Sequence, residues 1–130
     1  MIYETTEQAE HVFGGLFKIL IQDETFRSRL AETGLTAKLV HKKPDCTIYI
    51  SPDEVLLGGE APESALITIK MSCDTAHSLW MGTLMMPTAV ATGKVRIRGK
   101  VAKVIEFVPI LQPAFDRYPE IAASSGVAVR

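Results

Sequence analysis

Residues 76–119 read AHSLWMGTLMMPTAVATGKVRIRGKVAKVIEFVPILQPAFDRYP, and this stretch determines the fold that the sequence predicts. It begins with an apolar helical segment rich in methionine, continues into a short basic strand and ends in a second apolar helix. No group of polar residues within it has the spacing of a recognisable catalytic site. We therefore interpret the stretch as part of a container for an apolar molecule.

The composition indicates one globular domain with a large apolar interior. At 130 residues the chain has the size of a single domain, here residues 1–130. A chain of this length buries roughly two thirds of the surface that its unfolded form exposes. Hydrophobic residues make up 47% of the sequence, and the mean hydropathy is +0.17. With only 5 Phe, 3 Tyr and 1 Trp, aliphatic side chains and the adaptable methionine must fill the interior.

The charge and the cysteines restrict the partners and the compartment. A formal net charge of −1 favours neither a nucleic acid nor an anionic membrane, so only a local basic patch would bind either. Cys46 and Cys73 are too few for a disulfide framework and lack the spacing of a metal site. No apolar run approaches the ~18 residues of a membrane span, and the N-terminal residues are polar and acidic. We expect a soluble cytoplasmic protein without a targeting segment.

The first half of the chain predicts two helices and then strands. Apolar residues in 9–20 recur at helical spacing after a capping box of Thr5 and Gln8. A shorter helix begins after Asp23 and ends at Gly34. The period then changes to two in LTAKLVH, CTIYIS and EVLLGG, which turn-forming residues separate. These three segments predict an antiparallel meander.

The second half predicts two further strands and three helices. ALITIKMS is a fourth strand, and a helix capped by Ser72 or Asp74 follows it and ends at Gly82. Residues 84–91 form a short helix, and KVRIRG forms a fifth strand with one apolar side and one basic side. The last helix, VAKVIEFVPILQPAF, contains two prolines that interrupt or kink it, and SSGVAVR is a frayed tail.

The order of these elements predicts an α+β fold. Clustered strands with interspersed helices favour a five-stranded, mostly antiparallel sheet that about five helices cover on one face. The helices and this face are expected to enclose an apolar cavity, and the other face is expected to meet solvent.

Three neighbouring residues suggest chemistry, but a structural role explains them. Cys73, Asp74 and His77 lie within five positions, yet a metal site needs three or four ligands and Asp74 suits a helix cap. His41 stands at a strand end beside two lysines, where we expect it to be solvated. We therefore predict no catalytic residue, no metal site, no cofactor and no enzymatic activity.

A basic run leaves two interpretations open. Its residues are Lys94, Arg96, Arg98, Lys100 and Lys103. Cations at alternate positions are typical of the solvated face of a strand. They also suit a phosphate, a coenzyme A moiety or transient contact of Lys94, Arg96 and Arg98 with an anionic membrane. Nucleic acid is not expected as a partner, because no aromatic side chains are interleaved with the cations.

A series of segments in residues 65–118 has the pattern of a known family. The series comprises ALITIKMS, a helix ending in LWMG, TLMMPTAVATGK, the strand VRIRG and the helix VAKVIEFVPIL. Upstream, VLLGG stands where that family has a strand ending in leucine and glycine. The series resembles the sterol carrier protein 2 family.

The resemblance implies a non-catalytic domain with an apolar tunnel that binds fatty acid, fatty acyl-CoA, phospholipid or sterol. In the family, the first, middle and last helices line the cavity. Transferred by position, this implies ligand-binding roles for Phe13, Phe17, Leu20, Trp80, Leu84, Met85, Met86, Val90, Val104, Ile105, Val108 and Leu111.

Three hypotheses of function follow. The first is passive binding and transfer of a lipid, with the last helix as the moving part because Pro109 and Pro113 weaken it and nothing after Tyr118 anchors it. The second is an accessory domain that presents a hydrophobic groove to a partner protein or a lipid-modifying enzyme, for instance in a polyprenyl-quinone pathway. The third, an isomerase or hydrolase, requires an ionisable group in the cavity, and Glu106 is expected to lie on the outer face of its helix instead.

Overall fold

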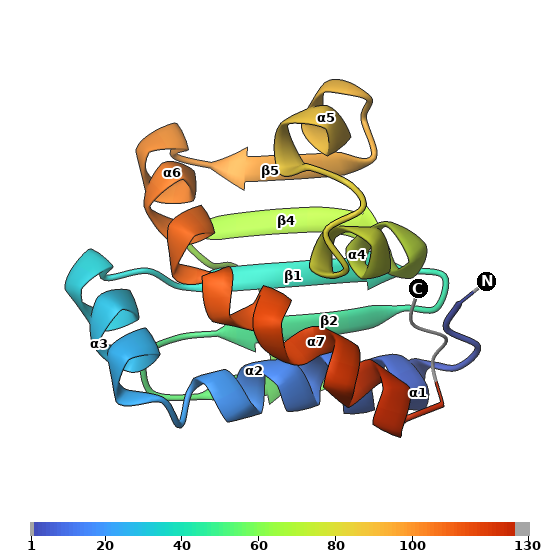
Figure 1. Cartoon of the computed structure of the whole chain (residues 1–130). Helices are drawn as coiled ribbons and strands as arrows, with labels where there is room; N and C mark the ends of the chain where they lie inside the picture. The colour runs from blue at the N-terminus through green and yellow to red at the C-terminus, as the bar shows by residue number, and fades with distance from the viewer. Residues whose placement is uncertain (1, 127–130) are drawn as a thin grey trace.

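A five-stranded sheet and a layer of helices form the structure, a computed structural model that describes residues 2–126 except the side chain of Val101 (Figure 1). The strands are β1 (Ala37–Lys42), β2 (Cys46–Ile50), β3 (Val55–Leu57), β4 (Ile67–Ser72) and β5 (Val95–Gly99), in the order β3-β2-β1-β4-β5. The β1–β2–β3 meander is antiparallel, as predicted, and β4 pairs with β5 in the same way. Only β1 and β4, among the described strands, are parallel. The predicted α+β fold with a mostly antiparallel sheet is confirmed.

The first helical segment is continuous but changes its hydrogen-bonding pattern. It consists of α1 (Thr6–Ala9), the π-helical turn η1 (Glu10–Gly14) and α2 (Gly15–Leu20). The hydroxyl of Thr5 accepts a hydrogen bond from the Gln8 N–H at 3.1 Å, which confirms the predicted cap. A Cβ atom on Gly14 would lie 2.9 Å from Leu57, so this glycine permits the close approach of the helix to β3.

The remaining helices follow the predicted boundaries closely until the C-terminus. They are α3 (Glu24–Thr33), α4 (Cys73–Trp80), α5 (Met86–Ala91), α6 (Val101–Ile110) and α7 (Gln112–Ser124), with a short 3₁₀ turn η2 (Gly58–Glu60). Asp23 caps α3, and Ser72, rather than Asp74, caps α4. The predicted last helix is two helices that meet at Leu111. Of the predicted tail, Ser124 is the last residue of α7 and residues 125–126 form a turn after it. Residues 127–130 lie outside the described part.

The sheet has one buried face and one exposed face. Inward side chains such as Leu39, Ile48 and Ile69 belong to one hydrophobic core, to which every helix from α1 to α7 also contributes buried residues. Lys70, Arg96 and Arg98 occupy the alternate positions and point away from the helices. This arrangement confirms the prediction that one face of the sheet meets solvent.

A buried chain of hydrogen bonds joins the two ends of the protein. The hydroxyls of Tyr3 and Tyr118 share a hydrogen bond of 2.6 Å, and the Tyr118 hydroxyl also bonds Nδ1 of His77 at 2.6 Å. All three side chains are buried. Tyr118 therefore fastens α7 to α4 and to the N-terminal segment. The expectation that nothing after Tyr118 anchors the last helix is wrong, because Ala122 is buried one turn later.

His41 lies in the core, which contradicts the expectation that it is solvated. Its ring stacks on Phe13 with centroids 4.6 Å apart, and its Nδ1 bonds the carbonyl oxygen of Cys46 at 2.9 Å. Burial lowers the pKa of His41 to about 4 and also lowers the pKa of His77. Both imidazoles are neutral at neutral pH.

Tyr118→Phe is expected to destabilise the protein by about 2–4 kcal/mol, because it leaves buried polar atoms of both Tyr3 and His77 without a partner. Tyr49→Phe is the matched control, since the Tyr49 hydroxyl makes no hydrogen bond within residues 2–126 and lies on the half-exposed sheet face. Urea denaturation measures both. Equal free energies of unfolding for the two variants would contradict the anchoring role.

Acid is expected to destabilise the protein through His41. Histidine in the unfolded chain has a pKa of about 6.5, so between that pH and about 4 the unfolded state binds more protons and stability falls as the pH falls. The contribution of His41 reaches about 3 kcal/mol at the acid end. Urea titrations across this pH range measure the free energy of unfolding. Its pH dependence should be shallower for His41→Phe, which keeps the ring stack, and should be unchanged for the control His11→Ala, which replaces an exposed histidine. His77 adds a dependence of the same sign in all three proteins.

Candidate functional site

An apolar pocket lies between the sheet and the helices. Its volume is about 280 Å³. The sheet contributes the floor from β1 and β4, one wall comes from α4 and the connection to α5, and the other comes from the junction of α6 and α7. The lining residues are Leu39, Ile69, Met71, Leu79, Trp80, Gly82, Leu84, Met85, Met86, Pro87, Val108, Pro109, Leu111, Gln112 and Phe115.

The pocket offers no ionised group to a ligand. None of its lining residues is charged, and Gln112, which is exposed, carries the one amide side chain among them. A charged group placed inside would lose its hydration without a compensating partner. The part of a ligand that enters this pocket is therefore apolar and neutral.

Local sequence explains how the two walls form. Gly82 has a φ of +79°, which suits glycine, and it follows the end of α4 so that the chain turns and brings Met85 and Met86 to the pocket. On the opposite wall, Pro109 lies inside α6 and the helix ends one residue after it. The break turns the chain into α7, whose Phe115 also lines the pocket.

Trp80 connects three helices at the pocket wall. Its ring meets Phe17 of α2 edge-on with centroids 5.9 Å apart, and it meets Phe115 of α7 in the same manner at 5.4 Å. Such edge-to-face pairs are favourable beyond the area they bury. The indole N–H is buried and has no hydrogen-bond partner within the described residues. Trp80 therefore fixes the wall by ring packing.

The structure places half of the predicted ligand-binding residues in the pocket. The six that line it are Trp80, Leu84, Met85, Met86, Val108 and Leu111. Phe13, Phe17 and Leu20 are buried in the core outside the lining. Val90 and Ile105 are exposed, and Val104 is half-buried against the core.

The lining also contains residues that the sequence interpretation missed. Leu39, Ile69 and Met71 form the floor, and Phe115 belongs to the wall. The period-two pattern of β1 and β4 was the available signal, because inward positions of adjacent strands must face the covering helices.

Cys73, Asp74 and His77 each make a structural contact. The thiol of Cys73 donates to the carbonyl oxygen of Pro44 at 3.2 Å, and burial raises its pKa to about 12. The carboxylate of Asp74 accepts a hydrogen bond from the Ile2 N–H at 3.0 Å. His77 bonds Tyr118. Within residues 2–126, no three or more His, Cys, Asp and Glu side chains are arranged to hold a metal ion.

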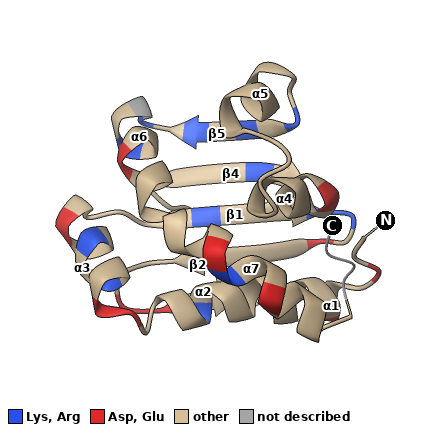
Figure 2. Ribbon diagram, viewed as in Figure 1, with Lys and Arg blue, Asp and Glu red and all other residues tan. Residues whose placement is uncertain are grey.

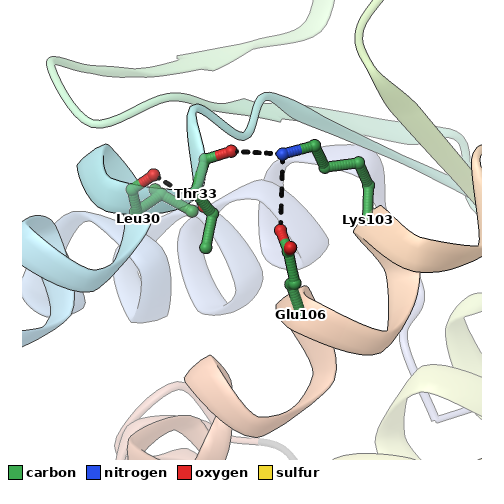
Figure 3. A network of polar contacts seen from close by, with 4 residues as sticks. All are labelled: Leu30, Thr33, Lys103 and Glu106. Atoms are coloured by element: carbon green, nitrogen blue, oxygen red, sulfur yellow. Dashed lines mark hydrogen bonds and ion pairs between the residues drawn. The ribbon is translucent and has the colours of Figure 1, made fainter.

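Glu106 lies on the exposed side of α6, as expected. Lys103 donates a hydrogen bond to the carbonyl oxygen of Thr33 at 2.7 Å and forms an ion pair with Glu106 at 3.4 Å (Figure 3). These contacts join the C-terminal end of α3 to α6. Glu106 is not among the residues that line the pocket.

In the described part of the chain, no helix has the length and apolar composition needed to cross a membrane.

Comparisons with known proteins agree on the fold. No protein-family model and no curated protein sequence matches the chain. A sterol carrier protein domain 2 of Helicoverpa armigera superposes with a TM-score of 0.62 at 20% identity, over 83% of this chain and 92% of that one. Sterol carrier protein 2 from Yarrowia lipolytica gives 0.60 at 18% identity, over 78% and 84%. A ubiquinone synthesis protein gives 0.57 at 20% identity, over 83% and 95%.

At identities this low, the superpositions establish a shared fold and say nothing about a shared function. Each superposition covers more than three quarters of both chains. The chain therefore has the sterol carrier protein 2 fold.

Proposed function

We propose that the protein, acting as a single domain, binds a lipid in the apolar pocket and transfers it without chemical change. The observation that carries this proposal is the lining, whose side chains are apolar except for the exposed amide of Gln112 and the indole N–H of Trp80 and include no ionisable group. General acid–base or nucleophilic catalysis needs such a group at the substrate. A fatty acid, fatty acyl-CoA, phospholipid or sterol-like molecule all present an apolar part to such a site.

The size of the pocket favours a slim occupant. Its volume of about 280 Å³ is just below the ~300–1,000 Å³ of most small-molecule sites. An acyl chain gains about 0.8 kcal/mol for each buried methylene before ordering costs are subtracted. We propose that an acyl chain enters, that its polar head remains near the exposed Gln112, and that the methionines adapt to its shape.

The contacts of the ligand are proposed for the six predicted residues that line the pocket, namely Trp80, Leu84, Met85, Met86, Val108 and Leu111. Phe13, Phe17 and Leu20 would support these walls from behind. Val90, Val104 and Ile105, which do not line the pocket, are not proposed as ligand contacts.

Entry and release require a moving part, and we reassign it to residues 82–91. The anchoring of α7 by Tyr118 argues against the last helix. By contrast, α5 has six residues and buries only Ala89 in full. Segments with few buried contacts open at low free-energy cost. Movement of this segment would carry Met85 and Met86 away from the opposite wall.

We also propose that transfer occurs in the cytoplasm and involves transient contact of Lys94, Arg96 and Arg98 with a membrane. The buried cysteines Cys46 and Cys73 are both free thiols, which suits a reducing compartment.

Filling the pocket is expected to weaken the binding of a fluorescent fatty acid. Val108 and Val104 are half-buried residues one turn apart on α6, but only Val108 lines the pocket. Val108→Phe should therefore weaken binding by about tenfold or more, whereas Val104→Phe should bind as the unchanged protein does. Fluorescence titration measures the affinities, and thermal unfolding checks that both variants fold.

Native mass spectrometry of protein purified from cells provides the second test. A co-purified lipid supports the proposal. The absence of both co-purified lipid and fatty-acid binding would reject it, and a stoichiometric partner protein in place of lipid would support an accessory role. Equal weakening by both valine substitutions would contradict the location of the site.

A further inference from the structure

The charges of the protein are segregated along the sequence. Residues 75–105 contain five of the 14 basic residues and none of the 15 acidic residues. The rest of the chain therefore carries 9 basic and 15 acidic residues. A net charge near zero conceals a basic segment within an acidic protein.

The basic segment forms one edge of the molecule. Four of its five cations lie on β5, an edge strand of the sheet, or directly next to either end of that strand, and the fifth, Lys103, lies on α6 (Figures 1 and 2). Lys94, Arg96, Arg98 and Lys100 are exposed, and none of them forms an ion pair within residues 2–126. On the outer sheet face, Arg96 pairs directly with Lys70 of β4. Like charges opposite each other in a sheet repel, so this edge favours an external anion.

Exposed apolar side chains lie on the segments that precede and follow β5 in the chain, and the helix α5 packs beside β5. Met85, Val90 and Ile105 are exposed by 66%, 44% and 65% respectively, on the segment before β5 and the helix after it. Each is close to the pocket in the chain. Met85 lines it, Val90 follows the lining residue Met86 by one helical turn, and Ile105 precedes the lining residue Pro109 by one turn.

We propose that this edge docks on an anionic phospholipid bilayer. The docking surface consists of Met85, Val90 and Ile105, which enter the interface, and of Lys94, Arg96, Arg98 and Lys100, which meet the lipid phosphates. Exposed apolar groups beside cations are the combination that holds proteins at a bilayer surface. The surface has no aromatic side chain on which nucleic-acid bases would stack.

The docking surface lies next to the pocket, and its role in lipid transfer rests on the proposed function. Docking would bring Met85 and the adjacent pocket against the lipid source, so that an acyl chain passes between bilayer and pocket with little exposure to water. The membrane contact itself is independent of ligand uptake and is measured separately.

Co-sedimentation with vesicles tests the docking surface. The protein is expected to bind vesicles of phosphatidylcholine mixed with phosphatidylglycerol, to bind phosphatidylcholine alone weakly, and to lose binding as salt is added. Each cation near an anionic leaflet raises partitioning about fivefold, so Arg96→Gln/Arg98→Gln should lower it about 25-fold. Lys18→Gln/Arg29→Gln removes the same charge from exposed positions on α2 and α3 and should have little effect. Val90→Ser/Ile105→Ser should reduce the binding that remains at high salt.

Several results would overturn the docking proposal. They are equal binding to both kinds of vesicle, equal losses in the two charge variants, and unchanged vesicle binding combined with self-association of Arg96→Gln/Arg98→Gln. The last result would mean that the arginines protect the free edge of β5 from pairing. An assay of fatty-acid binding without vesicles separates the two proposals. If the protein binds fatty acid but not vesicles, only the docking surface is rejected. If it binds vesicles but not fatty acid, only the lipid-binding function is rejected.

Discussion

The hydroxyl of Tyr118 holds together the parts of the protein that enclose the pocket. It joins His77 of α4 to α7, and through Tyr3 it adds the N-terminal segment. Trp80 follows His77 by three residues in α4, and Phe115 precedes Tyr118 by three in α7, so the polar bridge and the Trp80–Phe115 contact lie one turn apart along the same pair of helices. A polar contact with a defined geometry thus sets the separation of two walls whose own packing is apolar and adaptable.

Most of the fold could be predicted because periodicity and capping residues act locally. The change from helical spacing to alternation at Leu35, the cap at Asp23 and the stop at Gly34 all correspond to the observed elements. The predictions were wrong where tertiary contacts determine the extent of a helix or the burial of a side chain. Ala122 and Tyr118 extend α7 beyond the two prolines that suggested a weak end, and His41 is buried because alternation in β1 places it on the same side as Leu39.

The pocket was predicted in part for a similar reason. The methionines and Trp80 lie in a short apolar segment, which can be buried only against the covered face of the small sheet. Their place in the pocket wall could therefore be predicted from the sequence. In α6, however, Phe107 and Ile110 are buried, and the rotation that buries them turns Ile105 to solvent while Val108 reaches the pocket. A helix that is apolar on nearly all sides does not reveal which face is covered, and transfer by position from a family cannot replace that information.

The position of Trp80 has a practical consequence. It is the only tryptophan in the sequence, and it lies in the pocket wall between Phe17 and Phe115. The ultraviolet emission of the whole protein therefore originates almost entirely from the wall of the candidate site, and its wavelength depends on how much water reaches that wall. The molecule carries its own optical probe of pocket hydration, with no label attached.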